Sequence, residues 1–75
     1  MKKIKDKALG IYKKYLEKES LSKGIREVEI ILDKNDGSFP VVVGYNDGTS
    51  VIVNIKGDKR IATELAMIVF SGGSQ

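Results

Sequence analysis

The chain has 75 residues, of which 41% are hydrophobic and 31% charged, and this balance predicts one folded domain rather than a disordered segment. It contains neither cysteine nor histidine, which excludes disulfides, thiol chemistry and histidine-dependent catalysis. Its net charge of +3 is uneven, because the first 23 residues carry eight lysines against three acids and the remainder is net acidic.

The first predicted element is a helix over residues 2–20. Four lysines, Lys3, Lys7, Lys14 and Lys18, recur along one flank of it. Gly10 lies inside this helix, either because another backbone approaches it or because it is tolerated there, and Gly24 is expected to end the helix. Apolar residues recur at the helical period and form one stripe, which we expect to face the core: Ile4, Ala8, Ile11, Tyr12, Tyr15 and Leu16.

Three strands are expected next, because the apolar period changes to two from Arg26. The first strand alternates Val28, Ile30 and Leu32 toward the core, and residues 33–38 are rich in turn formers, which is typical of a hairpin loop. The second strand covers about 39–45 and the third about 49–56. Residues 46–48 are expected to close the second hairpin with Gly48 in a left-handed conformation.

The last segment is predicted to be a helix over residues 59–70 with Asp58 as its N-cap. Apolar residues cover almost its whole circumference, which favours burial on more than one side. An alternative reading makes residues 67–70 a short fourth strand, because isoleucine, valine and phenylalanine favour strands. Residues 71–75 are rich in glycine and serine and are expected to form a flexible tail.

Together these elements predict a single α+β domain over residues 1–70, with the order α-β-β-β-α and two layers. Both helices would pack on one face of a three-stranded antiparallel sheet. Parity along the strands places Ile31, Val42 and Ile52 on the other face, where three adjacent aliphatic side chains indicate a surface for a partner or for a second copy of the chain.

This element order resembles that of the double-stranded-RNA-binding domain. The residue-level similarity lies in the segment Gly57-Asp58-Lys59-Arg60-Ile61-Ala62, which is similar to the basic pair and alanine at the start of that family's second helix. The resemblance implies that Lys59 and Arg60 contact phosphates, with Lys56 nearby, and that the first helix and first hairpin loop reach adjacent minor grooves. Cations beside a helix N-terminus are also a physically reasonable phosphate site.

No catalytic grouping is apparent, because the serines lack a base and the carboxylates fall on turns and exposed strand positions. We therefore expect a non-enzymatic cytoplasmic binding module without metal or cofactor and without membrane contact. One interpretation is binding of duplex nucleic acid through phosphates by Lys3, Lys7, Lys14, Lys18, Lys56, Lys59 and Arg60. The alternative is binding of a protein, acidic or a second copy, through the Ile31, Val42 and Ile52 face or the over-apolar last helix.

Overall fold

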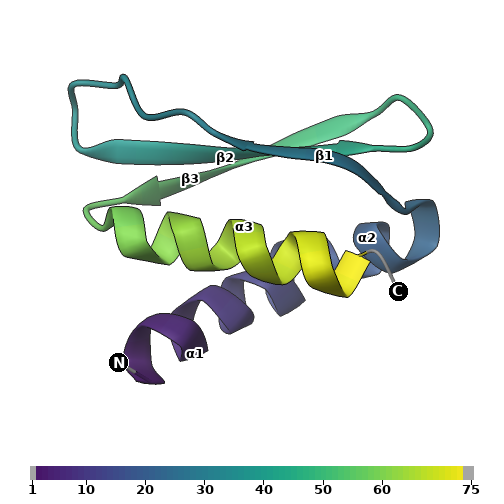
Figure 1. Ribbon diagram of the computed structural model, residues 1–75, viewed down its shortest axis with the longest axis horizontal. Coiled ribbons are helices and arrows are strands. Elements are labelled where there is room, and N and C mark those ends of the chain that lie inside the picture. Colours follow the sequence, from purple (N-terminus) through teal and green to yellow (C-terminus); the bar gives the residue numbers. More distant parts are fainter. Residues whose placement is uncertain (1, 74–75) are drawn as a thin grey trace.

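The computed structural model describes residues 2–73 and has the predicted order of helices around a three-stranded antiparallel sheet. Both helical segments lie on the same side of the sheet (Figure 1). Strand order is β1-β2-β3, so β2 is central and β1 and β3 are edges. The elements are α1 (Lys2–Ile11), η1 (Tyr12–Leu16), α2 (Glu17–Lys23), β1 (Ile25–Ile30), β2 (Ser38–Tyr45), β3 (Ser50–Lys56) and α3 (Lys59–Gly73).

The first helix contains a π-helical segment that the sequence did not predict. The Glu17 N–H bonds the Tyr12 carbonyl five residues earlier, which is the π pattern. The wider turn keeps residues four apart in line, and the buried positions are Ala8, Tyr12, Leu16 and Ser20. Tyr15 is turned outward and is 56% exposed, so its predicted place in the core stripe was wrong.

Gly24 ends this helix, as predicted, and also joins it to the sheet. Its φ is +79°, which favours glycine, and its N–H bonds the Ser20 carbonyl at 3.0 Å. Its own carbonyl accepts the Asn46 N–H at 3.0 Å. The helix end is therefore fixed beside the β2–β3 turn. In that turn Gly48 has φ +90° and the Tyr45 N–H bonds the Thr49 carbonyl at 2.8 Å, which confirms the predicted three-residue closure.

Proline ends the pairing of β1 with the central strand. The Ile31 N–H bonds the Pro40 carbonyl at 2.9 Å, but Pro40 has no N–H to return the bond. The β1 strand accordingly ends at Ile30. Leu32 lies in the loop that follows and is 57% exposed, so the prediction that it points into the core was wrong.

The core lies between the sheet and the helices. Two valines of β2, Val41 and Val43, are fully buried, as are Leu16 from η1 and Leu65 from α3. Helix α3 contacts all three strands, whereas α1 packs mainly against α3 (Figure 1). One cluster of buried side chains therefore joins both helices to the sheet, which is what a single domain of this length requires.

Helix α3 is longer than predicted. It runs to Gly73, so the alternative of a strand over residues 67–70 was wrong, and residues 71–73 are helical rather than part of the predicted tail. Residues 74 and 75 of that predicted tail lie outside the described residues. Asp58 caps the helix as predicted, because its Oδ1 accepts the Arg60 N–H at 2.9 Å.

Candidate functional site

The predicted phosphate site at the start of α3 already holds a carboxylate of the chain itself. Besides capping the helix, Asp58 accepts bonds from Arg60 Nε to Oδ1 and from Arg60 Nη2 to Oδ2, both at 3.1 Å. These bonds lower the pKa of Asp58 and raise that of Arg60. The helix N-terminus and Arg60 therefore both face Asp58, which competes with an external phosphate for them.

Other lysines of the predicted set gather near this end of the molecule. Helix α1 packs against α3, and Lys7 of α1 contributes electrostatically to the lowered pKa of Asp58. Lys56 and Lys59 flank Asp58 in sequence. The side chains of Lys3, Lys7, Lys56 and Lys59 are exposed. This end therefore carries four exposed lysines, but Asp58, Asp6 of α1 and Asp36 lie among them, the last beside Gly37, whose carbonyl accepts the Gly57 N–H at 2.8 Å.

The predicted lysine flank of the first helix is split by the π segment. Lys3 and Lys7 each precede a buried or half-buried residue by one position and so border the core stripe. Lys14 and Lys18 fall midway between buried positions, which places them on the outward side. The structure therefore does not bring all seven predicted cations to one face.

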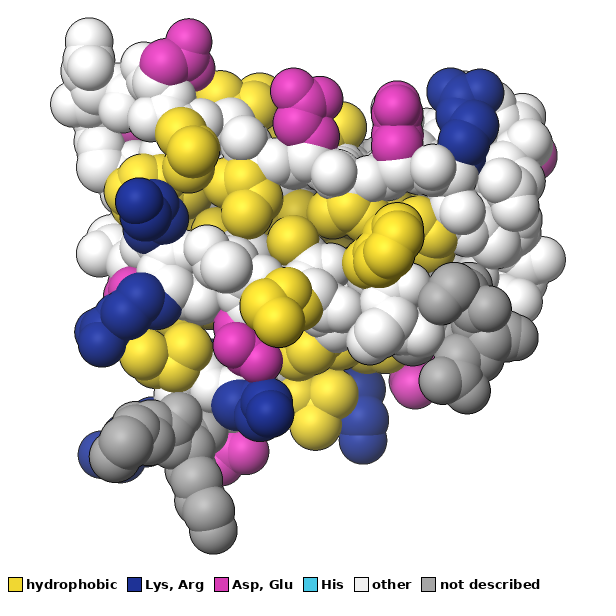
Figure 2. Space-filling model, viewed as in Figure 1, with side chains coloured by type: hydrophobic (Ala, Val, Ile, Leu, Met, Phe, Trp, Pro, Cys, Tyr) yellow, Lys and Arg dark blue, Asp and Glu magenta, His cyan; other side chains and the backbone are white. Residues whose placement is uncertain are grey.

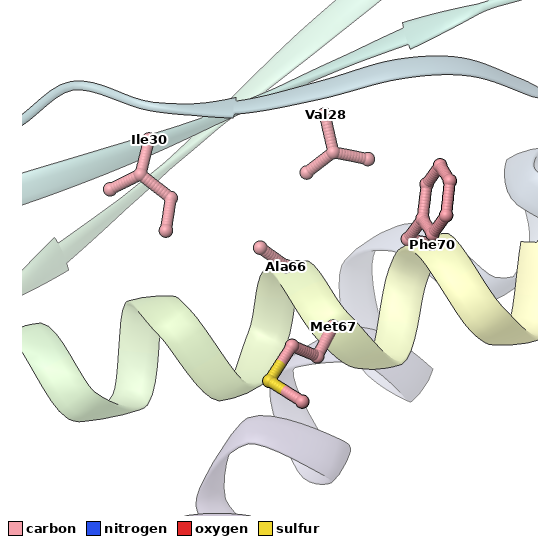
Figure 3. A pocket seen from close by; sticks show the side chains of 5 residues that line it. All are labelled: Val28, Ile30, Ala66, Met67 and Phe70. Atoms are coloured by element: carbon pink, nitrogen blue, oxygen red, sulfur yellow. The ribbon is translucent and has the colours of Figure 1, made fainter.

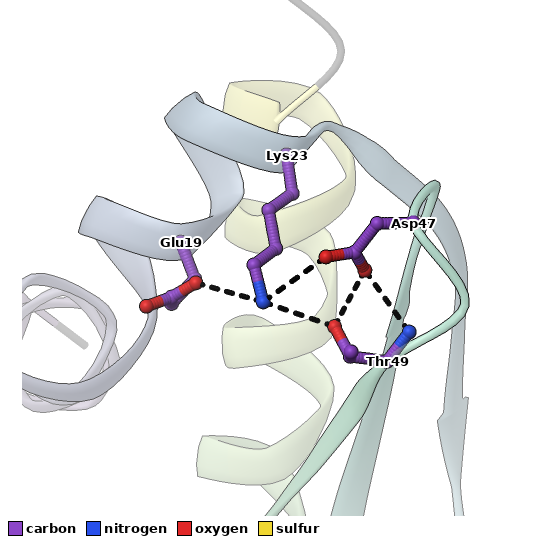
Figure 4. Close-up of polar contacts among 4 residues, drawn as sticks. All are labelled: Glu19, Lys23, Asp47 and Thr49. Atoms are coloured by element: carbon purple, nitrogen blue, oxygen red, sulfur yellow. Dashed lines mark hydrogen bonds and ion pairs between the residues drawn. The ribbon is translucent and has the colours of Figure 1, made fainter.

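Lys23, which the sequence analysis did not single out, ties the helix to the second hairpin (Figure 4). Its Nζ lies 3.1 Å from Glu19 Oε1 and 3.3 Å from Asp47 Oδ2, and it donates to Thr49 Oγ1 at 3.0 Å. Hydrogen bonds from Thr49, and then the Lys23 ammonium, lower the pKa of Asp47 to about 2. The ammonium also lies 5.4 Å from the Tyr45 ring centroid. This network has a structural role, because all its members connect α2 to the β2–β3 turn.

The open face of the sheet carries the predicted aliphatic residues in a looser arrangement. Val42 and Ile52 are direct cross-strand partners. Ile31 lies one row further along, opposite Pro40, so that it is diagonal to Val42. Ile52 is 62% exposed, while Ile31 and Val42 are half-buried. The three share a face, but only two of them are side by side.

An apolar groove lies on the other side of the sheet, between β1 and α3. It is lined by Val28 and Ile30 of β1 and by Ala66, Met67 and Phe70 of α3. Val28 and Ile30 point from the strand toward the helix, and Phe70 rises toward the strand (Figure 3). Met67 is 59% exposed and Phe70 63% exposed. A band of hydrophobic side chains accordingly runs along this face in the space-filling view (Figure 2).

The groove follows from the way the first helix covers only part of α3. Positions 62, 65 and 69 of α3 are fully buried, and they form the stripe that meets the sheet and the first helix. The stripe at positions 66, 67 and 70 has no such cover. The sequence indicated that the last helix is too apolar to be buried on one side only. It did not reveal which side remains open, because that depends on where the first helix crosses.

Among the described residues, no group of three or more acidic side chains is placed to hold a metal ion. Within the same residues, no helix has both the length and the apolar character needed to cross a bilayer. No protein-family model matches the chain, and no similar curated protein or solved structure was found. The resemblance to the double-stranded-RNA-binding domain therefore stays a prediction.

Proposed function

We propose that this protein is a small non-enzymatic binding module that holds a partner protein in the groove between β1 and α3. The observation that carries the proposal is the exposure of Met67 and Phe70 at a groove whose other wall is an edge strand. Covering large side chains that are about 60% exposed removes apolar surface from water, which is the main favourable term in protein association.

The test is a selection of peptides from a random displayed library on the immobilised protein. Selected peptides should bind the wild type and lose most of their affinity for a Met67→Ser/Phe70→Ser double variant. A matched control is Tyr15→Ser/Leu21→Ser, which removes two exposed apolar residues, 56% and 64% exposed, from the first helix. Equal binding to wild type and to the groove variant, or dependence on the control pair instead, would contradict the proposal.

A second candidate function is weak, sequence-independent binding of duplex nucleic acid through its phosphates. The observation in its favour is the lysine-rich end of the molecule, where Lys7, Lys56 and Lys59 are exposed around the start of α3. The Asp58–Arg60 pair weighs against it, because that pair occupies the helix N-terminus.

Titration with duplex RNA and duplex DNA at two salt concentrations tests this second function. If Lys7 and Lys59 both contact phosphates, a Lys7→Ala/Lys59→Ala variant should lower the log–log salt slope by about two units on DNA while leaving the Asp58–Arg60 pair in place. No binding of either duplex at low salt would remove this candidate.

A further inference from the structure

Strand β1 offers unpaired backbone groups along the border of the groove. Because Ile31 is hydrogen-bonded to Pro40, the antiparallel alternation directs the N–H and C=O groups of Ile30 and Val28 away from β2. In the described part of the chain, no other strand pairs with this side of β1. An edge of this kind is a template for an additional strand.

The same two residues also form one wall of the groove. The side chains of Val28 and Ile30 point toward α3, where Ala66 and Phe70 face them (Figure 3). A strand added beside β1 would place every second side chain on this side of the sheet, over the groove. Those side chains must be apolar, because the surface that receives them is apolar.

The alternate side chains of an added strand would meet negative charge. Glu27 and Glu29 of β1 are exposed and lie on the open-face side, opposite Gly44 and Val42. Acidic side chains stand along the β1 border of the hydrophobic band in Figure 2, with a basic side chain at its end, and Arg26 of β1 is also exposed. Opposite charges on neighbouring strands attract and like charges repel. This border therefore favours lysine or arginine at the alternate positions.

The acids also disfavour a second copy of this chain as the occupant. In an antiparallel pair of two β1 strands, Val28 of one copy would lie opposite Ile30 of the other, so that the free backbone groups of both residues are hydrogen-bonded in each strand. That register sets Glu29 directly against Glu29 of the second copy, which is a like-charge pair on adjacent strands.

We propose that the β1 edge binds an extended segment of another protein in which apolar and basic residues alternate, so that this segment becomes a fourth strand of the sheet. The proposal rests on the protein-binding function proposed above and adds the conformation and charge pattern of the partner. Main-chain hydrogen bonds to Val28 and Ile30 supply affinity, and the groove together with Glu27 and Glu29 supplies specificity.

The first probes are capped synthetic peptides that are added to the wild-type protein. One has the sequence Lys-Val-Lys-Ile-Lys-Val, a second replaces each lysine with glutamate, and a third groups the lysines before the apolar residues. A fourth is the alternating lysine peptide with N-methyl groups on the amides of its lysine residues, and a fifth has them on the amides of its apolar residues. We expect only the alternating lysine peptide and one of its two methylated forms to bind, with protection of the Val28 and Ile30 amides from hydrogen exchange.

A Glu27→Lys/Glu29→Lys variant supplies the charge test. Both positions are exposed, so its circular dichroism spectrum and melting curve should resemble those of the wild type. Two cross-strand charge pairs correspond to a change in affinity of about 2- to 30-fold. Because reversal replaces attraction with repulsion, the variant should lose at least that factor for the lysine peptide and gain at least that factor for the glutamate peptide.

The outcomes separate this inference from the function on which it rests. If peptides from the displayed library need Met67 and Phe70 but are indifferent to charge and to N-methylation, the groove binds proteins and the strand-addition proposal is overturned. If no peptide depends on the groove, both proposals fall. Sedimentation could instead show a dimer, with the Val28 and Ile30 amides protected from hydrogen exchange. That result would contradict a basic segment as the occupant of the β1 edge and would identify a second copy of this chain there.

Discussion

Neighbouring residues in the π segment should respond very differently to truncation. Leu16 is fully buried and Tyr15 is 56% exposed, although helical periodicity places both on the core stripe. Leu16→Ala removes apolar atoms from the centre of the core and should lower the free energy of unfolding by about 2–5 kcal/mol. Tyr15→Ala should change it by about 1 kcal/mol or less, because its side chain is mostly in water.

The size of the domain makes this contrast easy to measure. At about 0.05–0.15 kcal/mol per residue the whole chain has a stability of roughly 4–11 kcal/mol, so the Leu16 loss is a large share of it. The corresponding fall in melting temperature is roughly 8–40 °C. Urea titration and thermal melts followed by circular dichroism would measure both variants. Equal destabilisation by the two changes would refute the assignment of a π turn that separates them.

Three other predictions concern two glycines and one charged side chain. Gly10→Ala should stabilise the protein by about 0.5–1 kcal/mol in urea titration, because a Cβ there meets no atom within 4 Å and alanine favours helix. Gly24→Ala should instead destabilise it by about 1–3 kcal/mol, because φ is +79° and the new Cβ would lie 2.5 Å from Asn46 Nδ2. Hydrogen bonding to Thr49 lowers the pKa of Asp47 from 3.8 to about 2, so its contribution to stability is present above pH 4 and is lost as the pH falls toward 2. Between pH 4 and pH 2 the melting temperature should therefore fall less steeply for Asp47→Asn than for the wild type. The same dependence of melting temperature on pH in both proteins would contradict this.

Local chemistry made several elements predictable from the sequence. Gly48 after Asn46 and Asp47 specified the three-residue turn, and Asp58 specified the start of α3, because each signal lies within a few residues of the structure it directs. The fold class followed from the change of apolar period from helical to two, because this period shows which side of each helix or strand is buried.

The wrong predictions came from backbone geometry and from packing between segments, which the apolar pattern of one segment does not reveal. Tyr15 was misplaced because a π turn looks like an α-helix in apolar spacing, and Leu32 because Pro40, on a different strand, ends the β1 pairing. The lysine flank was split by the same π turn. The groove was missed because the open side of α3 depends on the path of the first helix over it. Tertiary packing decided each of these points.

One measurement tests the proposed groove most directly. The chain contains two methionines, Met1 and Met67, so methyl-labelled methionine places an isolated NMR probe at the groove. With a peptide selected on the wild-type protein, isotope-filtered NOE spectra should show contacts from the peptide to the Met67 methyl group and to the Phe70 ring. Contacts confined to the Val42 and Ile52 face, or to the lysine-rich end around Lys59, would contradict the proposed binding site.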